Sequence, residues 1–173
     1  MKIFTRVSLI LLLILFAAGS PYAMGQISFF DLLGSRNIGK AAPDFTLKTI
    51  AGKDVNMTRY RDGKKAIIFF WATWCPHCRV ALRELNQDRL EIEKKNIKII
   101  LVDLGEEVPE VEAYAKKNKI DGDIFLDEDN SLATPYGLVG VPTFYFLSED
   151  GIVRAIEHAL PKNYEELLVK SKS

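Results

Sequence analysis

Three runs of mostly apolar residues divide the chain and predict the core of a β-sheet. They cover residues 66–71, 97–104 and 143–147. Strands that are apolar on both faces are typical of a sheet that is covered by helices on its two sides. We therefore expect an α/β protein in which a central mixed sheet is flanked by helices.

The segments between these runs favour helices. A long helix over residues 75–96 is indicated by side chains that step by four, three, four and three residues, namely Cys78, Leu82, Leu85, Arg89 and Ile92. Arg89 is the charged exception on this face. Shorter helices are predicted over residues 109–118, 130–136 and 163–170, and the first of them has a proline at its start.

Turn residues predict two hairpins. Residues 44–47 and 54–57 flank a turn at Ala51-Gly52 and form the expected N-terminal hairpin, and Gly151 lies between the apolar run 143–147 and residues 152–158. Residues 26–39 have the composition of a lead-in segment. Because no long linker interrupts residues 40–173, we expect them to form a single domain.

The first 25 residues have the parts of a secretory signal peptide. Lys2 and Arg6 precede an apolar run, and Ala23-Met24-Gly25 puts small residues where a signal peptidase reads, so we expect cleavage before Gln26. The apolar run is shorter than the roughly 20 residues that cross a bilayer. The expected product is exported, to the periplasm or another extracytoplasmic space. An uncleaved N-terminal membrane anchor is the alternative.

Composition and charge exclude several classes of protein. The chain of 173 residues is 48% hydrophobic, enough to bury a core, and its 23 basic residues balance 23 acidic ones without a basic block. It therefore lacks the electrostatic pattern of a nucleic-acid-binding protein. Its two cysteines, Cys75 and Cys78, are too few for a disulfide framework or a four-sulfur metal site.

The spacing of Cys75 and Cys78 indicates redox chemistry. Residues three apart in a first helical turn lie on one face, close enough for a disulfide. Pro76 suits the first helical position, and Cys75 falls where free backbone N–H groups stabilise a thiolate. With His77 as a second positive partner, we expect a lowered pKa at Cys75 and an exposed, nucleophilic sulfur. Cys78 is expected to be shielded and to act as the resolving thiol.

A metal site and an inert structural disulfide are the alternatives to a redox role for this pair. A zinc site needs two more ligands, and the other histidine of the chain, His158, is far along the sequence, where we expect a surface residue. An inert disulfide would close too short a loop to stabilise the fold. A reactive dithiol without metal or cofactor is therefore favoured. A tuning role is expected for His77, with a solvated helix-start residue as the alternative.

Several motifs resemble those of thioredoxin-fold proteins of the TlpA/ResA type. They are Ala42-Pro43-Asp44-Phe45-Thr46-Leu47, the run Phe70-Trp71-Ala72-Thr73-Trp74-Cys75, Tyr136-Gly137, Gly140-Val141-Pro142-Thr143 and Glu149-Asp150-Gly151. The resemblance covers residues 40 to about 170. It implies a thioredoxin-like three-layer fold and a thiol-disulfide oxidoreductase whose partners are protein thiols or disulfides.

The resemblance also implies further site residues. In that family the proline that matches Pro142 is cis and lies beside the dithiol, where the backbone of Val141 binds an extended substrate segment. Trp74, next to Cys75, is expected to shape the substrate surface. Apart from the resemblance, the sequence indicates only that an X-Pro bond such as Val141-Pro142 tolerates the cis form. A trans proline at the start of a strand is the alternative.

Two departures from the family leave the direction of electron flow open. Phe69 stands where thioredoxin has a buried aspartate, and Ala81 stands where the ResA type has a glutamate. The Pro76-His77 dipeptide is the one found in DsbA, a strong oxidant. Because a lower thiolate pKa stabilises the dithiol form, this dipeptide favours oxidation. We expect a disulfide reductase, for example in cytochrome c maturation, with a DsbA-like oxidase as the alternative.

Peroxiredoxins and non-catalytic binding modules are two further classes of protein to compare with the sequence. The opening Ala42-Pro43-Asp44-Phe45 also occurs in peroxiredoxins, but Ile68 and Ala72 replace the proline and threonine of their P-x-x-x-T-x-x-C motif. A non-catalytic binding module, such as a metal or polypeptide carrier on the same fold, is the other alternative. The pair Glu106-Glu107 has no expected role.

Overall fold

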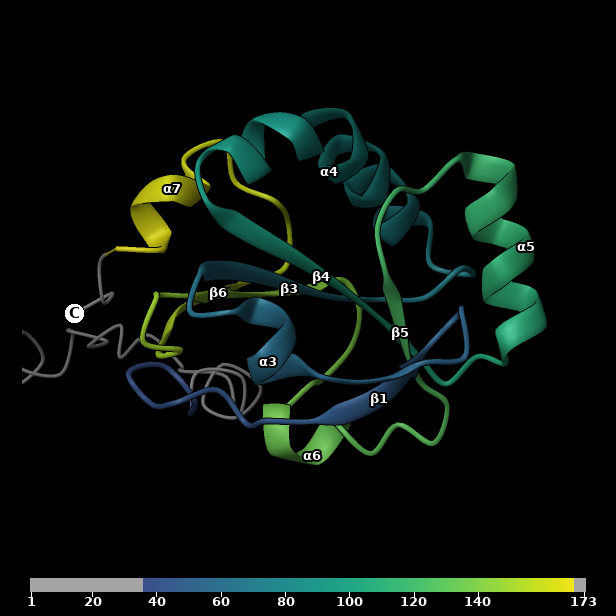
Figure 1. Cartoon of the computed structure of the whole chain (residues 1–173), viewed down its shortest axis with the longest axis horizontal. Coiled ribbons are helices and arrows are strands. Elements are labelled where there is room, and N and C mark those ends of the chain that lie inside the picture. Colours follow the sequence, from purple (N-terminus) through teal and green to yellow (C-terminus); the bar gives the residue numbers. More distant parts are fainter. Residues whose placement is uncertain (1–35, 170–173) are drawn as a thin grey trace, which may run out of the picture.

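The computed structural model describes residues 36–169, which form a seven-stranded sheet between two layers of helices (Figure 1). The predicted signal peptide and most of the predicted lead-in segment lie outside the described residues. The strands are β1 (Thr46–Thr49), β2 (Asp54–Asn56), β3 (Lys65–Trp71), β4 (Ile97–Leu104), β5 (Ile124–Asp127), β6 (Thr143–Leu147) and β7 (Val153–Glu157). Their order across the sheet is β2-β1-β5-β4-β3-β6-β7.

The sheet is mixed, as expected. Strand β4 runs parallel to both β3 and β5, while β1 with β2, β1 with β5, β3 with β6 and β6 with β7 are antiparallel. The three apolar runs of the sequence are strands β3, β4 and β6, which lie side by side in the centre. Both predicted hairpins are confirmed, β1–β2 and β6–β7.

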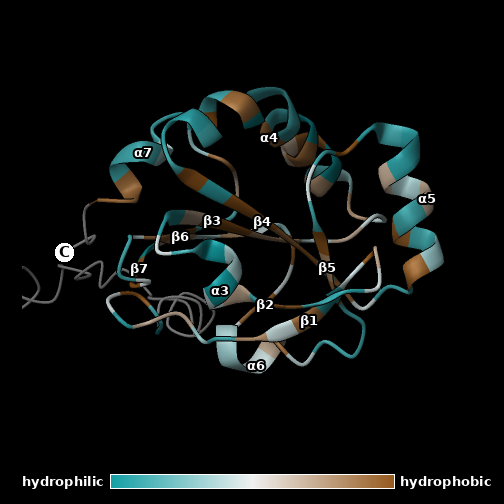
Figure 2. Cartoon of the chain, in the orientation of Figure 1, coloured by the Kyte–Doolittle hydropathy of each residue, from teal (hydrophilic) through white to brown (hydrophobic). Residues whose placement is uncertain are grey.

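Helices cover both faces of the sheet (Figure 1). On one side lie α4 (Pro76–Lys94), α5 (Val108–Asn118) and α7 (Tyr164–Leu167), and on the other lie α3 (Met57–Arg61) and α6 (Ala133–Tyr136). The helices are mostly polar on the outside, whereas the apolar residues concentrate on the central strands (Figure 2). The expected three-layer α/β arrangement is confirmed.

Alternate residues of β3 supply the two halves of the core. Ile67, Phe69 and Trp71 pack under α4, and Ile68 and Phe70 pack on the opposite face against α3 and α6. Residues 66–71 are all fully buried. This burial on both faces is what the uninterrupted apolar run predicted.

The pattern missed two short elements, and it placed the charged Arg89 correctly on the apolar face of the long helix. Strand β5 has four residues and helix α3 has five, too short for a periodic signal. Helix α3 begins where the second strand was expected to end, because the side chain of Asn56 accepts a hydrogen bond from the N–H of Arg59 and caps the helix. Arg89 is buried on the apolar face of α4, where it forms an ion pair with Glu93.

The described start of the chain is joined to the far edge of the sheet. Ala41 forms an isolated bridge with Ile152, and the buried Asn37 donates hydrogen bonds to the carbonyl of Pro135 and the hydroxyl of Tyr145. Among the helices of residues 36–169, none has both the length and the apolar composition that a membrane span requires.

Candidate active site

The chain turns from β3 into α4 at the two cysteines. Cys75 is the N-cap residue of α4, Pro76 is the first residue of the helix, and a disulfide joins Cys75 to Cys78 with their Cα atoms 5.2 Å apart. The sulfur of Cys75 accepts a hydrogen bond from the backbone N–H of Cys78 at 3.2 Å. The expected placement of the pair at a helix start is therefore what the structure shows.

The helix start provides an environment that favours a thiolate at Cys75. The N-cap position faces the N–H groups that have no partner within the helix, and these carry the positive end of the helix dipole. A negative sulfur at this position gains a charge-assisted hydrogen bond from Cys78 N–H. Because Cys78 lies inside the first turn, it does not share this position.

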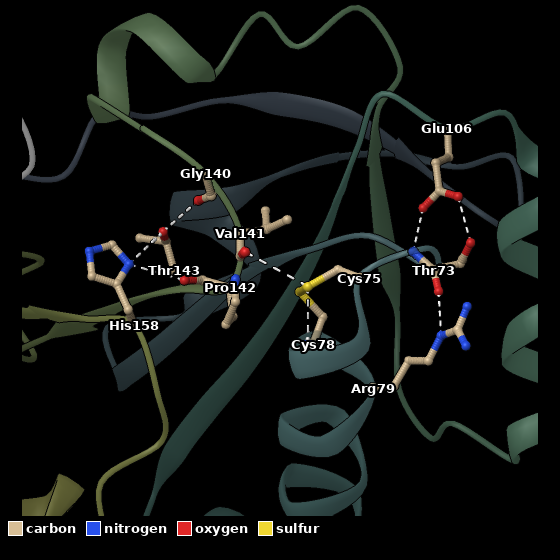
Figure 3. Close-up of a disulfide and its surroundings, with 10 residues drawn as sticks. All are labelled: Thr73, Cys75, Cys78, Arg79, Glu106, Gly140, Val141, Pro142, Thr143 and His158. Atoms are coloured by element: carbon tan, nitrogen blue, oxygen red, sulfur yellow. Dashed lines mark hydrogen bonds between the residues drawn. A yellow bond between two sulfur atoms is a disulfide. The ribbon is translucent and has the colours of Figure 1, made fainter. Parts of the chain in front are cut away.

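We expected the sulfur of Cys75 to be exposed, and this prediction is wrong for the disulfide form. Cys75 is 3% exposed and Cys78 is fully buried. The loop before β6 covers the bond from one side, since the sulfur of Cys75 lies 3.7 Å from the carbonyl oxygen of Val141 (Figure 3). The side chain of Trp71 and the apolar face of α4 belong to the same buried cluster.

Residues around the pair form the rim of the site. Trp74 is 64% exposed directly before Cys75, and Pro76 and His77 are exposed on the first turn of α4. An exposed Trp is an unusual surface residue that is enriched where proteins bind each other. The side chain of His77 is exposed to solvent.

A second loop, residues 140–143, meets the dithiol (Figure 3). The Val141–Pro142 peptide bond is cis. The hydroxyl of Thr143 donates to the carbonyl of Gly140 at 2.8 Å, and Nδ1 of His158 lies 3.1 Å from the carbonyl oxygen of Pro142 and 3.3 Å from the hydroxyl of Thr143. Since a carbonyl can only accept, Nδ1 carries the hydrogen.

His158 is a residue of the site that the sequence did not reveal. It is exposed, as expected, but it follows β7 and reaches the loop through the pairing of β7 with β6. The antiparallel pairing of β7 with β6 brings His158 next to Pro142, which is 16 residues away in the sequence. A lone histidine after a strand carries no signal for this contact.

On the other side of the dithiol, the loop between β3 and α4 is held by two charged side chains (Figure 3). The carboxylate of Glu106 accepts hydrogen bonds from the backbone N–H and the hydroxyl of Thr73, both at 2.5 Å. Nε of Arg79 donates to the carbonyl of Thr73 at 2.7 Å. Glu106, which had no expected role, is buried and anchors the residue two positions before Cys75.

Asp103 lies close to this anchor at the end of β4. Its side chain is fully buried, and neither carboxyl oxygen receives a hydrogen bond from a donor among residues 36–169. Burial, followed by the effect of the adjacent Glu106 carboxyl, raises the pKa of Asp103 to about 8. A single acid within an apolar strand was the sequence signal that could have singled out this residue.

Comparison with known proteins places the chain in a family. Residues 38–156 match the AhpC/TSA family. The chain is 31% identical over 150 residues to "Thiol-disulfide oxidoreductase ResA" of Geobacillus thermodenitrificans, covering 86% of this chain and 83% of that protein. It is also 31% identical over 110 residues to "Sporulation thiol-disulfide oxidoreductase A" of Bacillus subtilis, covering 62% of this chain and 66% of that protein.

Solved structures agree in fold. The crystal structure of StoA from Bacillus subtilis superimposes with a TM-score of 0.60 at 27% identity, covering 73% of this chain and 95% of that one. A putative thiol:disulfide interchange protein DsbE from Chlorobium tepidum gives a TM-score of 0.67 at 24% identity, covering 75% and 92%. The fold is therefore thioredoxin-like.

Fold, dithiol and relatives together define a thiol-disulfide oxidoreductase. The chain belongs to the AhpC/TSA family, and its resemblance to the ResA type is confirmed. Within the described residues no cluster of three or more histidine, cysteine, aspartate or glutamate side chains has the geometry to hold a metal ion.

Proposed function

We propose that the protein is exported by residues 1–25 and exchanges disulfides with protein substrates outside the cytoplasm, with residues 40–173 as the catalytic domain. The basic start, apolar run and small residues at 23–25 support export. Retention of the same segment would anchor the domain at the membrane instead. Assay of the mature N-terminus in the extracytoplasmic fraction separates the two.

The observation that carries the proposal is the position of Cys75. Its sulfur lies at the N-cap of α4, with the N–H of Cys78 on one side and the carbonyl of Val141 on the other. The first contact stabilises a thiolate. The second places the sulfur beside a backbone segment that can pair with an extended polypeptide through Val141, next to the exposed Trp74.

In the reductive direction, the Cys75 thiolate attacks a substrate disulfide. A bond forms between Cys75 and one substrate sulfur, and the other substrate sulfur leaves as a thiolate that takes a proton. Cys78, deprotonated, then attacks Cys75, which releases the second substrate thiol and leaves the Cys75–Cys78 disulfide. A partner dithiol returns two electrons and two protons and restores the reduced site.

We propose disulfide reduction as the physiological direction, with the substrate of cytochrome c maturation, an apocytochrome disulfide, as an example. The basis for this choice is the resemblance to the ResA type, whose relatives are named as thiol-disulfide oxidoreductases without a direction. The Pro76-His77 dipeptide supports the opposite direction, a DsbA-like oxidase. Because the side chain of His77 is exposed, solvent screens its electrostatic effect on Cys75, which weakens the argument for an oxidase.

The experiment combines a redox titration with a trap. Equilibration with glutathione buffers gives the reduction potential, and a value near that of thioredoxin, about −270 mV, supports a reductase, whereas one near that of DsbA, about −120 mV, supports the oxidase. Expression of Cys78→Ser should accumulate mixed disulfides through Cys75, with Cys75→Ser/Cys78→Ser as the matched control. A dithiol that exchanges no faster than free glutathione would instead indicate a binding module.

A further inference from the structure

A buried acidic pair lies beside the dithiol and has no part in the exchange described above. It consists of Asp103, at the end of β4, and Glu106, in the loop between β4 and α5. Both side chains are buried, at 0% and 7% exposure. Buried carboxylates without a positive partner are costly, so each needs hydrogen bonds or a proton.

Hydrogen bonds account for Glu106 but not for Asp103. Glu106 accepts from the N–H and the hydroxyl of Thr73, which suits an ionised carboxylate. Asp103 receives nothing from a donor within residues 36–169, and its nearest titratable neighbour is Glu106. Two carboxyl groups can bond to each other only if one of them carries a proton. A proton on Asp103 would let it donate to the adjacent Glu106, whose carboxyl raises the pKa of Asp103.

Other groups around Asp103 do not change this assignment. Its partners in the sheet, Trp71 on β3 and Leu126 on β5, are uncharged. Glu110 on α5 adds a second negative charge that disfavours ionisation of Asp103. From α4, Nε of Arg79 donates to the carbonyl of Thr73, and Arg79 is not among the groups that shift the pKa of Asp103.

The pair is connected to the dithiol in two ways. Thr73, which Glu106 holds, is two residues before Cys75 in the same tight loop, where the N–H of Cys75 bonds to the carbonyl of Ala72. Asp103 also projects to the face of the sheet that carries the cysteines, because its register partner Trp71 belongs to the buried cluster that contains both of them. A thiolate at Cys75 and a carboxylate at Asp103 would repel in this low-dielectric space.

We propose that Asp103 and Glu106 share one proton and that the pair holds this proton more tightly when the Cys75–Cys78 disulfide is reduced, so that an ionised Asp103 takes up a proton in that step. A partner dithiol supplies two electrons and two protons and becomes a disulfide. One proton goes to Cys78, Cys75 remains a thiolate, and the second proton goes to Asp103 if it was ionised. The negative charge thus moves from the acidic pair to Cys75, and the total charge is unchanged.

The redox state of the disulfide and the protonation of Asp103 must affect each other equally, so either effect can be measured. If reduction favours a proton on Asp103, the pKa of Asp103 must be higher in the reduced protein than in the oxidised protein. Between the two values, reduction consumes an additional fraction of a proton. The reduction potential therefore falls more steeply with pH in that interval than it does outside it.

The direct test is a carbon-13 NMR titration of the Asp103 carboxyl in the oxidised and the reduced protein. We expect a midpoint near 8 in the oxidised form and a higher one in the reduced form. A midpoint near the ordinary value of about 4, or equal midpoints in the two forms, overturns the proposal. The measurement uses the unmodified sequence, so it does not depend on the folding of a variant.

Three variants distinguish a specific effect of Asp103 and Glu106 from a general effect of removing a negative charge. Asp103→Asn keeps a hydrogen-bond donor toward Glu106 but cannot titrate, so the steeper interval of potential against pH should disappear. Glu106→Gln should lower the Asp103 midpoint, because it removes the adjacent like charge. Glu107→Gln, an equal charge change at the exposed neighbour, should leave both unchanged. A Glu106→Gln variant that behaves like Glu107→Gln contradicts the proposal.

This inference rests on the proposed thiolate at Cys75, but the two can fail separately. The NMR titration contains no substrate. Disulfide exchange with a peptide disulfide, measured on the same samples, reports on the proposed function. If disulfide exchange is normal and the Asp103 midpoint is the same in the oxidised and the reduced protein, only the proposal for the acidic pair is rejected. If disulfide exchange is absent, the proposed function is rejected.

Discussion

The sulfur of Cys75 and the carbonyl oxygen of Val141 lie 3.7 Å apart, although 66 residues separate them in the chain. The contact joins the start of α4 to the loop before β6, which the antiparallel pairing of β3 with β6 brings together. A polypeptide that pairs with the backbone at Val141 would therefore present its own sulfur to Cys75.

Removal of the His77 imidazole should have a small effect in a defined direction. If His77 stabilises the Cys75 thiolate, His77→Ala raises the pKa of that thiol and lowers the reduction potential. One full pKa unit corresponds to about 30 mV for a two-electron couple, and solvent exposure of His77 should keep the change below that. Equilibration with glutathione measures it. Arg83→Ala, an exposed cation further along α4, is the control, and an equal change in both variants would remove the tuning role.

Trp74 should matter for protein substrates and not for the chemistry. Because its side chain is 64% exposed, Trp74→Ala should leave the free energy of unfolding within about 0.5 kcal/mol. The kcat/KM for a protein disulfide should fall about tenfold, as for a loss of about 1.4 kcal/mol at an interface anchor. The rate with a small disulfide should hold. Leu90→Ala, 71% exposed on α4, is the control, and equal losses with large and small disulfides would contradict a docking role.

His158 should position the loop that carries Pro142. His158→Leu removes the donor that lies 3.1 Å from the Pro142 carbonyl, whereas His158→Asn offers an amide N–H in its place. We expect KM for a protein disulfide to rise about threefold to tenfold in the leucine variant, as for one lost hydrogen bond, with asparagine near wild type. Amide chemical shifts of Val141 should change in the leucine variant. Two variants with the same kinetics would show that the hydrogen bond has no role.

Stability should depend on pH through Asp103. Its pKa of about 8 in the folded protein is raised above its ordinary value of 3.8, so the folded state binds more protons than the unfolded state between these values. The stabilisation is complete below about pH 4 and is lost as pH rises through about 8. Asp103→Asn should flatten this decline by an amount on the order of 1 to 3 kcal/mol. Urea unfolding from pH 5 to 9 measures it, and parallel curves for the variant and wild type would contradict the assignment.

The central layers of the fold could be predicted because burial on both faces leaves a strong pattern. Strand β6 matches its apolar run at residues 143–147, and β3 extends the run at residues 66–71 by one residue. Strand β5 was missed because its four residues lie between Gly122 and a run of acidic residues. No local signal separates so short an apolar stretch from a loop.

The dithiol could also be predicted, but its surroundings could not. Local rules place Cys75 at a helix start, since they depend on neighbouring residues in the chain. Glu106 and His158 reach the site from the segments that follow β4 and β7, and their positions follow from sheet order and register. The burial of Cys75 was missed for the same reason, because the covering loop comes from residue 141.

The proposed function depends most directly on Cys75 being the nucleophile, and alkylation of the reduced protein tests this role. The protein is reduced, treated briefly with iodoacetamide at mildly acidic pH, and digested for mass spectrometry, with unfolded protein as the control. We expect the label on Cys75 well before Cys78, since the N-cap position favours a thiolate at Cys75 and Cys78 is buried in the first turn. Preferential labelling of Cys78, or equal labelling as in the unfolded control, would contradict the assignment.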